Sequence, residues 1–463
     1  MTAHAGRVLL AGGAVLSMDP AVGDLEQGDV LVEDGAIVAV APHLEVSDCD
    51  QIDATGMVVM PGLVEAHRHL WYAAIRGTGM DATVSDMKAV HWPRLAAHYT
   101  PEDLYVATRS GAVDALEHGI TTVLDWCHVI NSPDHGAEAV RALGELPIRA
   151  IFAYGASMAR KLGEFAGRAE HGDSWEPARR LRRDVLSSDR ARQTMALAIQ
   201  GPEFTSIEKT AADLAVAREL DLPVTMHCGT PAGAPPRRAI RALSDAGLLH
   251  ARMQFVHCCT TSDEELVQLA DVGATAVACP IAELAMAMGE PAVGRMRDAG
   301  LPVAAGADAV AVSSGDLFDE ARAAILSERG IARRRVVAQG RPVRRCEDLG
   351  FTAREALEAI TIGAARACHI DDRVGSLTPG KRADVVMLRA TELNLSPVSD
   401  VVGMVVSSAH GLNVDTVLVD GQIVRRGGRF VDQNIDVGQI QRALAACRDR
   451  LRAAGGFKPT SGD

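Results

Sequence analysis

Short apolar runs alternate with longer amphipathic segments through the middle of the chain. The helix-like segments are 101–118, 207–220, 261–272 and 290–299. The strand-like runs are Ile120–Leu124, Ile148–Phe152, Met195–Ile199, Leu222–Met226, Met253–Val256, Ala274–Ala278 and Leu301–Ala305. With an opening run that ends near residue 69, they make about eight βα units. Near-continuous apolar strands between helices indicate a parallel sheet, and this number favours an α/β fold of the closed (β/α)8 TIM barrel type.

Both ends of the chain instead show short strands separated by turn residues. Asp34-Gly35 and Asp420-Gly421 are each flanked by apolar residues, which is typical of β-hairpins. Neither end holds enough strands for a stable sheet alone, so we expect one small β-sandwich domain built from residues 1–58 and 377–435. The barrel would then span 59–376. Apolar residues at helical spacing predict a terminal helix and tail over 436–463.

Composition narrows the class of protein. The chain has 463 residues, 48% of them hydrophobic, and a formal net charge of −13 without a long basic run. This charge argues against nucleic acid or an anionic membrane as a partner. Nine cysteines, an odd number, do not form a disulfide framework. Without a cleavage-site pattern or an apolar window of about 18 residues, we expect a cytoplasmic protein.

Ionisable residues recur where the predicted strands end. His67 and His69 are two apart, so in a strand they project from one face. Any single histidine here could be an ordinary core residue. However, His227, His257 and Asp308 also follow strands, and barrel active sites lie at those ends. Imidazoles and a carboxylate meeting there predict a metal site, with zinc as the usual occupant.

These segments resemble the amidohydrolase superfamily, in particular the branch of cytosine deaminases, S-adenosylhomocysteine deaminases and atrazine/triazine chlorohydrolases. The similarity rests on the segments 61–69, 224–227, 255–257, 306–308 and 375–384, and it spans nearly the whole chain. It implies that His67, His69, His227 and Asp308 ligate one divalent metal. Asp308 would also accept a proton from the attacking water, and His257 would polarise the substrate or hydrogen-bond that water.

The resemblance carries further expectations about the metal and the assembly. Dinuclear members have a lysine after the fourth strand, whereas this chain continues Ile199-Gln-Gly-Pro-Glu-Phe204. We therefore expect one metal ion, Zn²⁺ first and Fe²⁺ second. The resemblance also implies that the protein forms a homo-oligomer, either a dimer or a tetramer. Its substrate would be a small molecule.

Three features depart from the family pattern. One is the end of the seventh strand, which reads Val277-Ala-Cys-Pro280 where a His-Asn-Pro or His-Cys-Pro type motif is usual. Aminohydrolases of this branch often carry a glutamate three residues after the fifth-strand histidine, where this chain has Thr230. Glu283 could supply the missing acid from another side of the pocket, or it could be a helix-capping or surface carboxylate. Arg68, between the two histidines, would point away from the metal as a structural brace with an unidentified partner.

Aromatic residues near strand ends suggest what the pocket binds. Aromatic residues make up 3% of the chain, yet Trp71, Trp126 and His128 all fall at this mouth. They could stack on and hydrogen-bond a flat ring, or simply pack the loops. The leading hypothesis is a mononuclear metal-dependent hydrolase of C–N bonds in a small cyclic or heteroaromatic compound, of deaminase type. Ring opening of a cyclic amide or amidine, or a catalytically silent metal-binding homologue, are the alternatives.

Overall fold

A parallel barrel forms the centre of the molecule. The computed structural model describes residues 6–155, 157, 175–230 and 238–457, so the last six residues of the predicted tail lie outside it. Seven barrel strands pair in chain order: β6 (Leu63–Arg68), β7 (Ile120–Cys127), β8 (Arg149–Gly155), β9 (Gln193–Ala198), β10 (Val224–Cys228), β11 (Met253–His257) and β12 (Thr275–Val277). The uninterrupted burial of β7, β8 and β11 fits a sheet covered on both faces.

The eighth barrel position is not a regular strand. Only isolated bridges, Ala278 to Ala305 and Arg68 to Asp308, close the ring between β12 and β6. Pro302 has no N–H to donate. The N–H of Ala305 bonds to the carbonyl of Ala359, at 2.9 Å, instead of to a neighbouring strand. The predicted barrel is thus confirmed, with its last strand reduced to two bridges.

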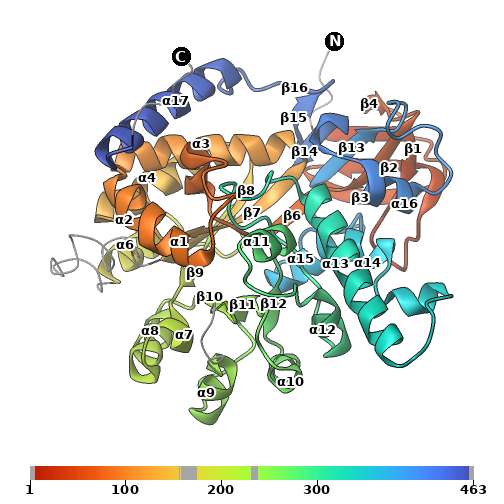
Figure 1. Cartoon of the computed structure of the whole chain (residues 1–463). Coiled ribbons are helices and arrows are strands. Elements are labelled where there is room, and N and C mark those ends of the chain that lie inside the picture. The colour runs from red at the N-terminus through yellow and green to blue at the C-terminus, as the bar shows by residue number, and fades with distance from the viewer. Residues whose placement is uncertain (1–5, 156, 158–174, 231–237, 458–463) are drawn as a thin grey trace.

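Helices surround the barrel (Figure 1). Their bounds are α3 (Pro101–Glu117), α4 (Pro133–Gly144), α6 (Glu176–Asp184), α7 (Gly201–Phe204), α8 (Ile207–Glu219), α9 (Ala239–Asp245), α10 (Asp263–Val272), α11 (Pro280–Ala285), α12 (Val293–Asp298) and α13 (Leu317–Ala338). Two shorter helices follow, α14 (Ala353–Ala359) and α15 (Ile362–Ala367). They are separate because the carbonyls of Ala359 and Ile360 accept hydrogen bonds from barrel residues.

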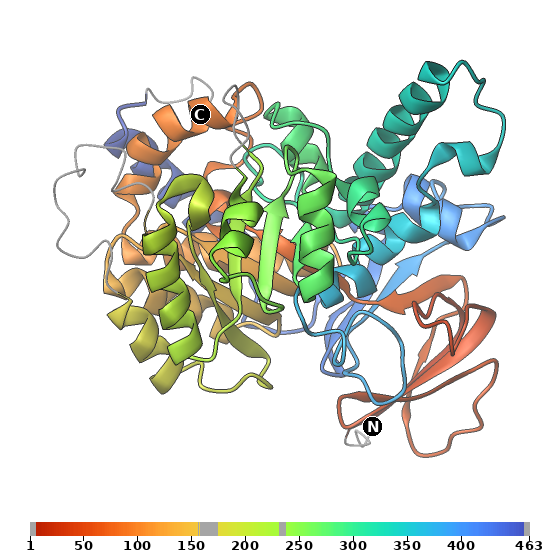
Figure 2. The same cartoon turned by 90° about the horizontal axis from the view of Figure 1, so that it is seen from below.

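The two chain ends form one mixed sheet beside the barrel, as predicted. Figure 2 shows the red N-terminal strands beside the blue C-terminal ones. The order is β16-β15-β14-β13-β5-β1-β2-β3, with β4 also on β1. The strands are β1 (Arg7–Val15), β2 (Leu25–Glu33), β3 (Ala36–Ala41), β4 (Asp50–Asp53), β5 (Met57–Pro61), β13 (Val385–Arg389), β14 (Val414–Val419), β15 (Gln422–Arg426) and β16 (Arg429–Phe430).

The run that opens the barrel is two strands, not one. The expected boundary after residue 58 falls inside β5, and the chain passes from sheet to barrel at Gly62. A Cβ atom on Gly62 would lie 2.2 Å from the Thr121 hydroxyl oxygen, so only glycine fits this crossing. After α16 (Val401–Ser408), the terminal helix α17 (Val437–Ala454) lies along α3 (Figure 1).

A short helical segment leads from β6 to α3. It comprises α1 (Val84–Asp86), the π-helical turn η2 (Met87–His91) and α2 (Trp92–Arg94). We call residues 84–94 the cover segment. The Arg94 side chain donates to the carbonyls of Gly455 and Gly456, which ties this segment to the chain beyond α17. Among the described residues, no helix is long and apolar enough to cross a membrane.

Candidate active site

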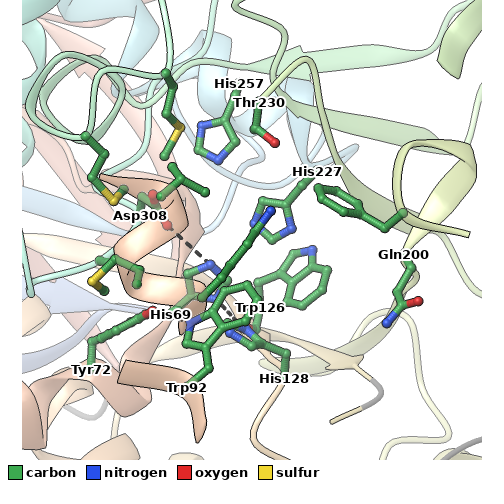
Figure 3. A pocket seen from close by; sticks show the side chains of 17 residues that line it. His69, Tyr72, Trp92, Trp126, His128, Gln200, His227, Thr230, His257 and Asp308 are labelled. Atoms are coloured by element: carbon green, nitrogen blue, oxygen red, sulfur yellow. Dashed lines mark hydrogen bonds and ion pairs between the residues drawn. The ribbon is translucent and has the colours of Figure 1, made fainter. Parts of the chain in front are cut away.

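Five sequence-predicted residues meet at the carboxyl end of the barrel. His67 lies in β6, with His69 just after it, while His227 and His257 lie in β10 and β11. The carboxylate Oδ1 of Asp308 lies 3.2 Å from His69 Nε2 and 3.5 Å from His67 Nε2. Figure 3 shows His69, His227, His257 and Asp308 facing one cavity.

The donor atoms form two overlapping groups that share His67. His67, His69 and Asp308 offer atoms that all lie within 4.8 Å of one another, and so do His67, His227 and His257. Both ring nitrogens of His67 are buried and have no hydrogen-bond partner among the described residues. A buried imidazole without a partner is costly, so a cation among these donors suits them well. The chemistry of the set, imidazoles with one carboxylate, fits a divalent transition metal.

Residues behind the donors fix their orientation. His69 donates from Nδ1 to the carbonyl of Trp126 at 2.5 Å, which leaves its Nε2 facing Asp308. Glu65 accepts the N–H of Ala307 at 2.9 Å and so joins β6 to the chain just before Asp308. Burial raises the pKa of Glu65 to about 7.

The site keeps the His67 ring neutral and the Asp308 carboxylate charged. Burial lowers the pKa of His67 to about 3, so this ring is neutral and able to ligate at neutral pH. Burial alone would raise the pKa of Asp308, but the imidazoles of His67 and His69 close to its carboxylate hold that pKa well below its usual value. His257 differs, because its contacts to Glu283 and the nearby Asp308 overcome burial and raise its pKa.

Glu283 lies behind His257 and does not line the cavity. Its Oε1 accepts from His257 Nδ1 at 3.1 Å and from the N–H of Cys279 at 2.6 Å. The side chain is fully buried. The expected role of Glu283 as an acid from another side of the pocket stays a prediction, and its placement behind His257 does not favour it. Its contacts are those of a residue that orients His257.

The cavity region spans about 690 Å³, including space open to solvent, and has largely apolar walls. Trp126 and His128 line it as predicted, and the indole Nε1 of Trp126 and both nitrogens of His128 have no described hydrogen-bond partner. Trp71 does not line it. Trp71 is fully buried and stacks on Tyr72, with ring centroids 3.8 Å apart, so Tyr72 takes its place on the wall.

Several lining residues were missed in the sequence. The cover segment contributes Val84, Met87, Lys88 and Trp92, and Phe204, Met286 and Met288 complete the apolar wall. The cover segment shows no apolar periodicity that would have marked it as part of a pocket. Only its position, between a strand ending in two histidines and the first long helix, could have drawn attention to it.

Arg68 has the bracing contacts that its position suggested. It is buried, and its guanidinium donates to Asp114 on α3 at 2.6 Å and to the carbonyl of Gly315 at 3.2 Å. Burial opposes the negative charge of Asp114, but Arg68 and Arg76 lower the pKa of that carboxyl. Arg68 thus joins β6 to α3 on the side away from the cavity.

Thr230, at the position where a glutamate was expected, has a carboxylate behind it. Its hydroxyl and its N–H both donate to Glu203 Oε1, at 3.0 Å and 2.9 Å, and Gly229 N–H donates to Glu203 Oε2 at 2.5 Å. Glu203 lies in α7, just after β9, and is buried. Thr230 faces the cavity, whereas Glu203 does not line it.

Comparisons with known proteins agree with this geometry. A 5-methylthioadenosine/S-adenosylhomocysteine deaminase of Symbiobacterium thermophilum is 30% identical over 435 residues, 90% of this chain and 93% of that protein. A zinc-bound adenosine deaminase from Xanthomonas campestris has a similar fold, with a TM-score of 0.81 at 24% identity over 96% of this chain and 98% of that one. Zinc-bound atrazine chlorohydrolase from Arthrobacter aurescens matches with a TM-score of 0.79 and 23% identity. The match covers 95% of this chain and 100% of that one.

The family model covers both the barrel and part of the terminal sheet. The model described as the amidohydrolase family matches residues 58–424, which include every histidine and carboxylate discussed above. Sequence, barrel and histidine cluster therefore lead to one conclusion: this chain belongs to the amidohydrolase family.

Proposed function

We propose that this chain is a metal-dependent aminohydrolase that removes an amino group from a heteroaromatic ring, with a purine nucleoside type of substrate as the first choice. The observation that carries the proposal is the meeting of His67, His69, His227 and Asp308, with His257 opposite, in a cavity lined by aromatic side chains. The similarity to the 5-methylthioadenosine/S-adenosylhomocysteine deaminase of Symbiobacterium thermophilum supports the choice of a purine ring.

His67, His69, His227 and Asp308 would hold one divalent cation, with zinc preferred over iron. Such a cation, when bound, lowers the pKa of a water molecule toward neutrality. His257 also has a ligand atom within 4.8 Å of those of His67 and His227. Glu283 raises the pKa of His257 and bonds to its Nδ1. We therefore propose that His257 contacts the substrate and does not ligate the metal.

Each residue then has a defined task in hydrolysis. Asp308 accepts a proton from the attacking water as its oxygen bonds to the ring carbon. The N–H of His257 that faces the cavity stabilises the negative charge that develops on the ring. Trp126 offers a stacking face and an unpaired indole N–H, and His128 offers a hydrogen-bonding edge. Tyr72 and Trp92 also line the cavity.

Ammonia release from a substrate panel tests the proposal. The protein is loaded with zinc, its metal content is measured, and it is offered methylthioadenosine, S-adenosylhomocysteine, adenosine, cytosine, an aminotriazine and a cyclic amide. We expect one zinc per chain and ammonia from at least one amino-heterocycle. Ring opening without ammonia would support the cyclic amide hydrolase instead. A zinc-loaded protein inert to the whole panel would favour the silent homologue. The dimer or tetramer and the cytoplasmic location also stay proposals, based on the family resemblance.

A further inference from the structure

One lysine reaches the cavity from the cover segment. Lys88 lies in η2 and lines the cavity beside Met87 and Trp92. Its ammonium lies 4.6 Å from the ring centroid of Phe204, a cation–π contact, and it forms no ion pair with any described residue. A half-buried cation without a direct counter-ion, at the wall of a substrate cavity, is placed to interact with the substrate.

Glu203 links the ammonium of Lys88 to the region of Thr230. Phe204, over whose ring the ammonium sits, directly follows Glu203, and Glu203 accepts the hydrogen bonds of Thr230 described above. The Glu203 charge also acts on Lys88. These contacts bring the lysine to the region where Thr230 replaces the glutamate expected as proton shuttle.

The identity of this residue is unusual for the chain. Of 47 lysines and arginines, only five are lysines, namely Lys88, Lys161, Lys209, Lys381 and Lys458. An arginine would offer the same charge and a better stacking surface, but its guanidinium does not release a proton at accessible pH. A lysine at this position can release a proton, which an arginine cannot. Burial lowers the pKa of Lys88, partly opposed by Glu203, which brings proton release closer to neutral pH.

Other ionisable groups around the cavity have other contacts. On its own segment, Asp86 bonds to Thr83 and His91 to the carbonyl of Thr78. The ionisable groups of other elements that line the cavity with Lys88 are Tyr72, His69, His128, His227, His257 and Asp308. Glu203, behind Thr230, also acts on Lys88 through its charge. Asp308 is committed to the attacking water, and Glu283 is screened by His257.

We propose that Lys88 is a catalytic residue that donates a proton to the departing amine. The inference rests on the function proposed above. Water gives its oxygen to the ring carbon and one proton to Asp308, and the electron pair of the ring C–N double bond moves onto the ring nitrogen. That pair then re-forms the double bond as the bond to the amino group breaks. The departing nitrogen takes a proton from the Lys88 ammonium and leaves as ammonia. The proton on Asp308 returns through solvent to the neutral amine.

Substitutions that separate charge from proton donation test the proposal. Lys88→Arg keeps the cation but not the transferable proton, Lys88→Met removes both, and Lys209→Arg on α8 is the matched control. Each zinc-loaded variant is assayed on an amino-heterocycle and on the same ring carrying chloride, which departs without a proton. We expect Lys88→Arg to lower kcat for ammonia release about 100-fold or more, and kcat for chloride release less than about threefold.

A second readout does not depend on turnover. Acylation of the lysines at a series of pH values, followed by mass spectrometry, gives the pH at which Lys88 becomes reactive. We expect this midpoint to lie below that of N-acetyl-lysine amide in the same tube. A midpoint at or above the reference would overturn the proposal.

The kinetic outcomes separate this inference from the function beneath it. If wild type releases no ammonia from any substrate, the aminohydrolase proposal and the proton donor fall together. If wild type is active and Lys88→Arg keeps its ammonia release within threefold, only the proton donor is wrong. Equal losses of ammonia and chloride release in Lys88→Arg would mean that Lys88 acts only in binding, which also overturns it. Unchanged zinc content and melting temperature in each variant exclude misfolding.

Discussion

Asp308 is joined to His67 through both main chain and side chain. Its N–H donates to the carbonyl of His67 at 3.0 Å, and its Oδ1 lies 3.5 Å from His67 Nε2. The carbonyl of Asp308 in turn accepts the N–H of His69 at 2.8 Å. Asp308 has a φ of 55°, an uncommon conformation for a residue with a side chain. The backbone pairing that closes the barrel therefore also sets the distance between carboxylate and imidazoles.

Replacing Asp308 by asparagine should abolish hydrolysis while leaving the barrel folded. The amide can still pack against His67 and His69, but it cannot accept the proton of the attacking water. We expect kcat for ammonia release to fall by about 10³-fold or more, with an unchanged melting temperature and weaker zinc binding. Stopped assays at saturating zinc separate the two effects. Activity within tenfold of wild type at full zinc occupancy would remove Asp308 from proton transfer.

Glu283→Gln should shift the pH dependence of the reaction. Burial alone would lower the pKa of His257, whereas the Glu283 hydrogen bond and the charge of Asp308 raise it. Without the Glu283 charge, His257 should lose its proton at a lower pH. If the protonated ring stabilises the developing charge, the alkaline limb of the kcat profile should move to lower pH. We also expect a fall in kcat of about 10- to 100-fold. An unchanged rate and profile would contradict an orienting role for Glu283.

The chemistry of the site could be predicted from the sequence because its donors follow individual strands. His67, His69, His227, His257 and Asp308 each lie where an apolar run ends, and parallel strands bring those ends together. The distinction between Trp71 and Tyr72 could not be predicted. The chain turns into a short 3-10 helix at Leu70, so consecutive side chains no longer alternate as in a strand, and Trp71 turns inward.

The cover segment illustrates another limit. Lys88 and Trp92 reach the cavity only because residues 84–94 fold back over the barrel and Arg94 bonds to the carbonyls of Gly455 and Gly456. Such a contact joins residues more than 350 positions apart, and no local pattern encodes it. The same holds for Glu203, whose role depends on the neighbouring strand that places Thr230 beside it.

Trp126→Phe should affect substrate binding, whereas Trp71→Phe should affect stability. Trp126 lines the cavity with an unpaired indole N–H, and phenylalanine keeps a stacking ring but lacks this donor. KM should therefore rise about 3- to 10-fold, which corresponds to the loss of a hydrogen bond worth about 0.5–1.5 kcal/mol. Trp71 is buried behind Tyr72, so its truncation should cost about 0.5–3 kcal/mol of stability. Its KM should stay unchanged. Steady-state kinetics and urea denaturation distinguish them. A KM effect confined to Trp71→Phe would show that the two indoles had been assigned the wrong way round.

Arg149→Met should destabilise the contact between barrel and terminal sheet. Arg149, on β8, is buried, and its guanidinium donates to Asp384 at 2.9 Å and 3.0 Å and to Asp420 at 2.5 Å. Removing the cation leaves the buried Asp384 carboxylate without its ion pair beside Asp420, which keeps Arg382. Breaking a buried ion pair in this way costs about 3–5 kcal/mol. The exposed pair of Arg190 and Asp372 is the matched control, and Arg190→Ala should cost about 0–1 kcal/mol.

The pH dependence of this loss gives a sharper test. Burial opposes the charge of Asp420, but Arg149 and Arg382 lower its pKa, so its stabilising contribution is present above the unfolded pKa of about 3.9 and is lost as pH falls through the folded value. In Arg149→Met the pKa of Asp420 should rise, and protonation should relieve the repulsion. The difference in unfolding free energy between wild type and variant should therefore shrink as the pH falls from 7 to 4. A difference that stays constant over this range would mean that Arg149 contributes packing and not charge.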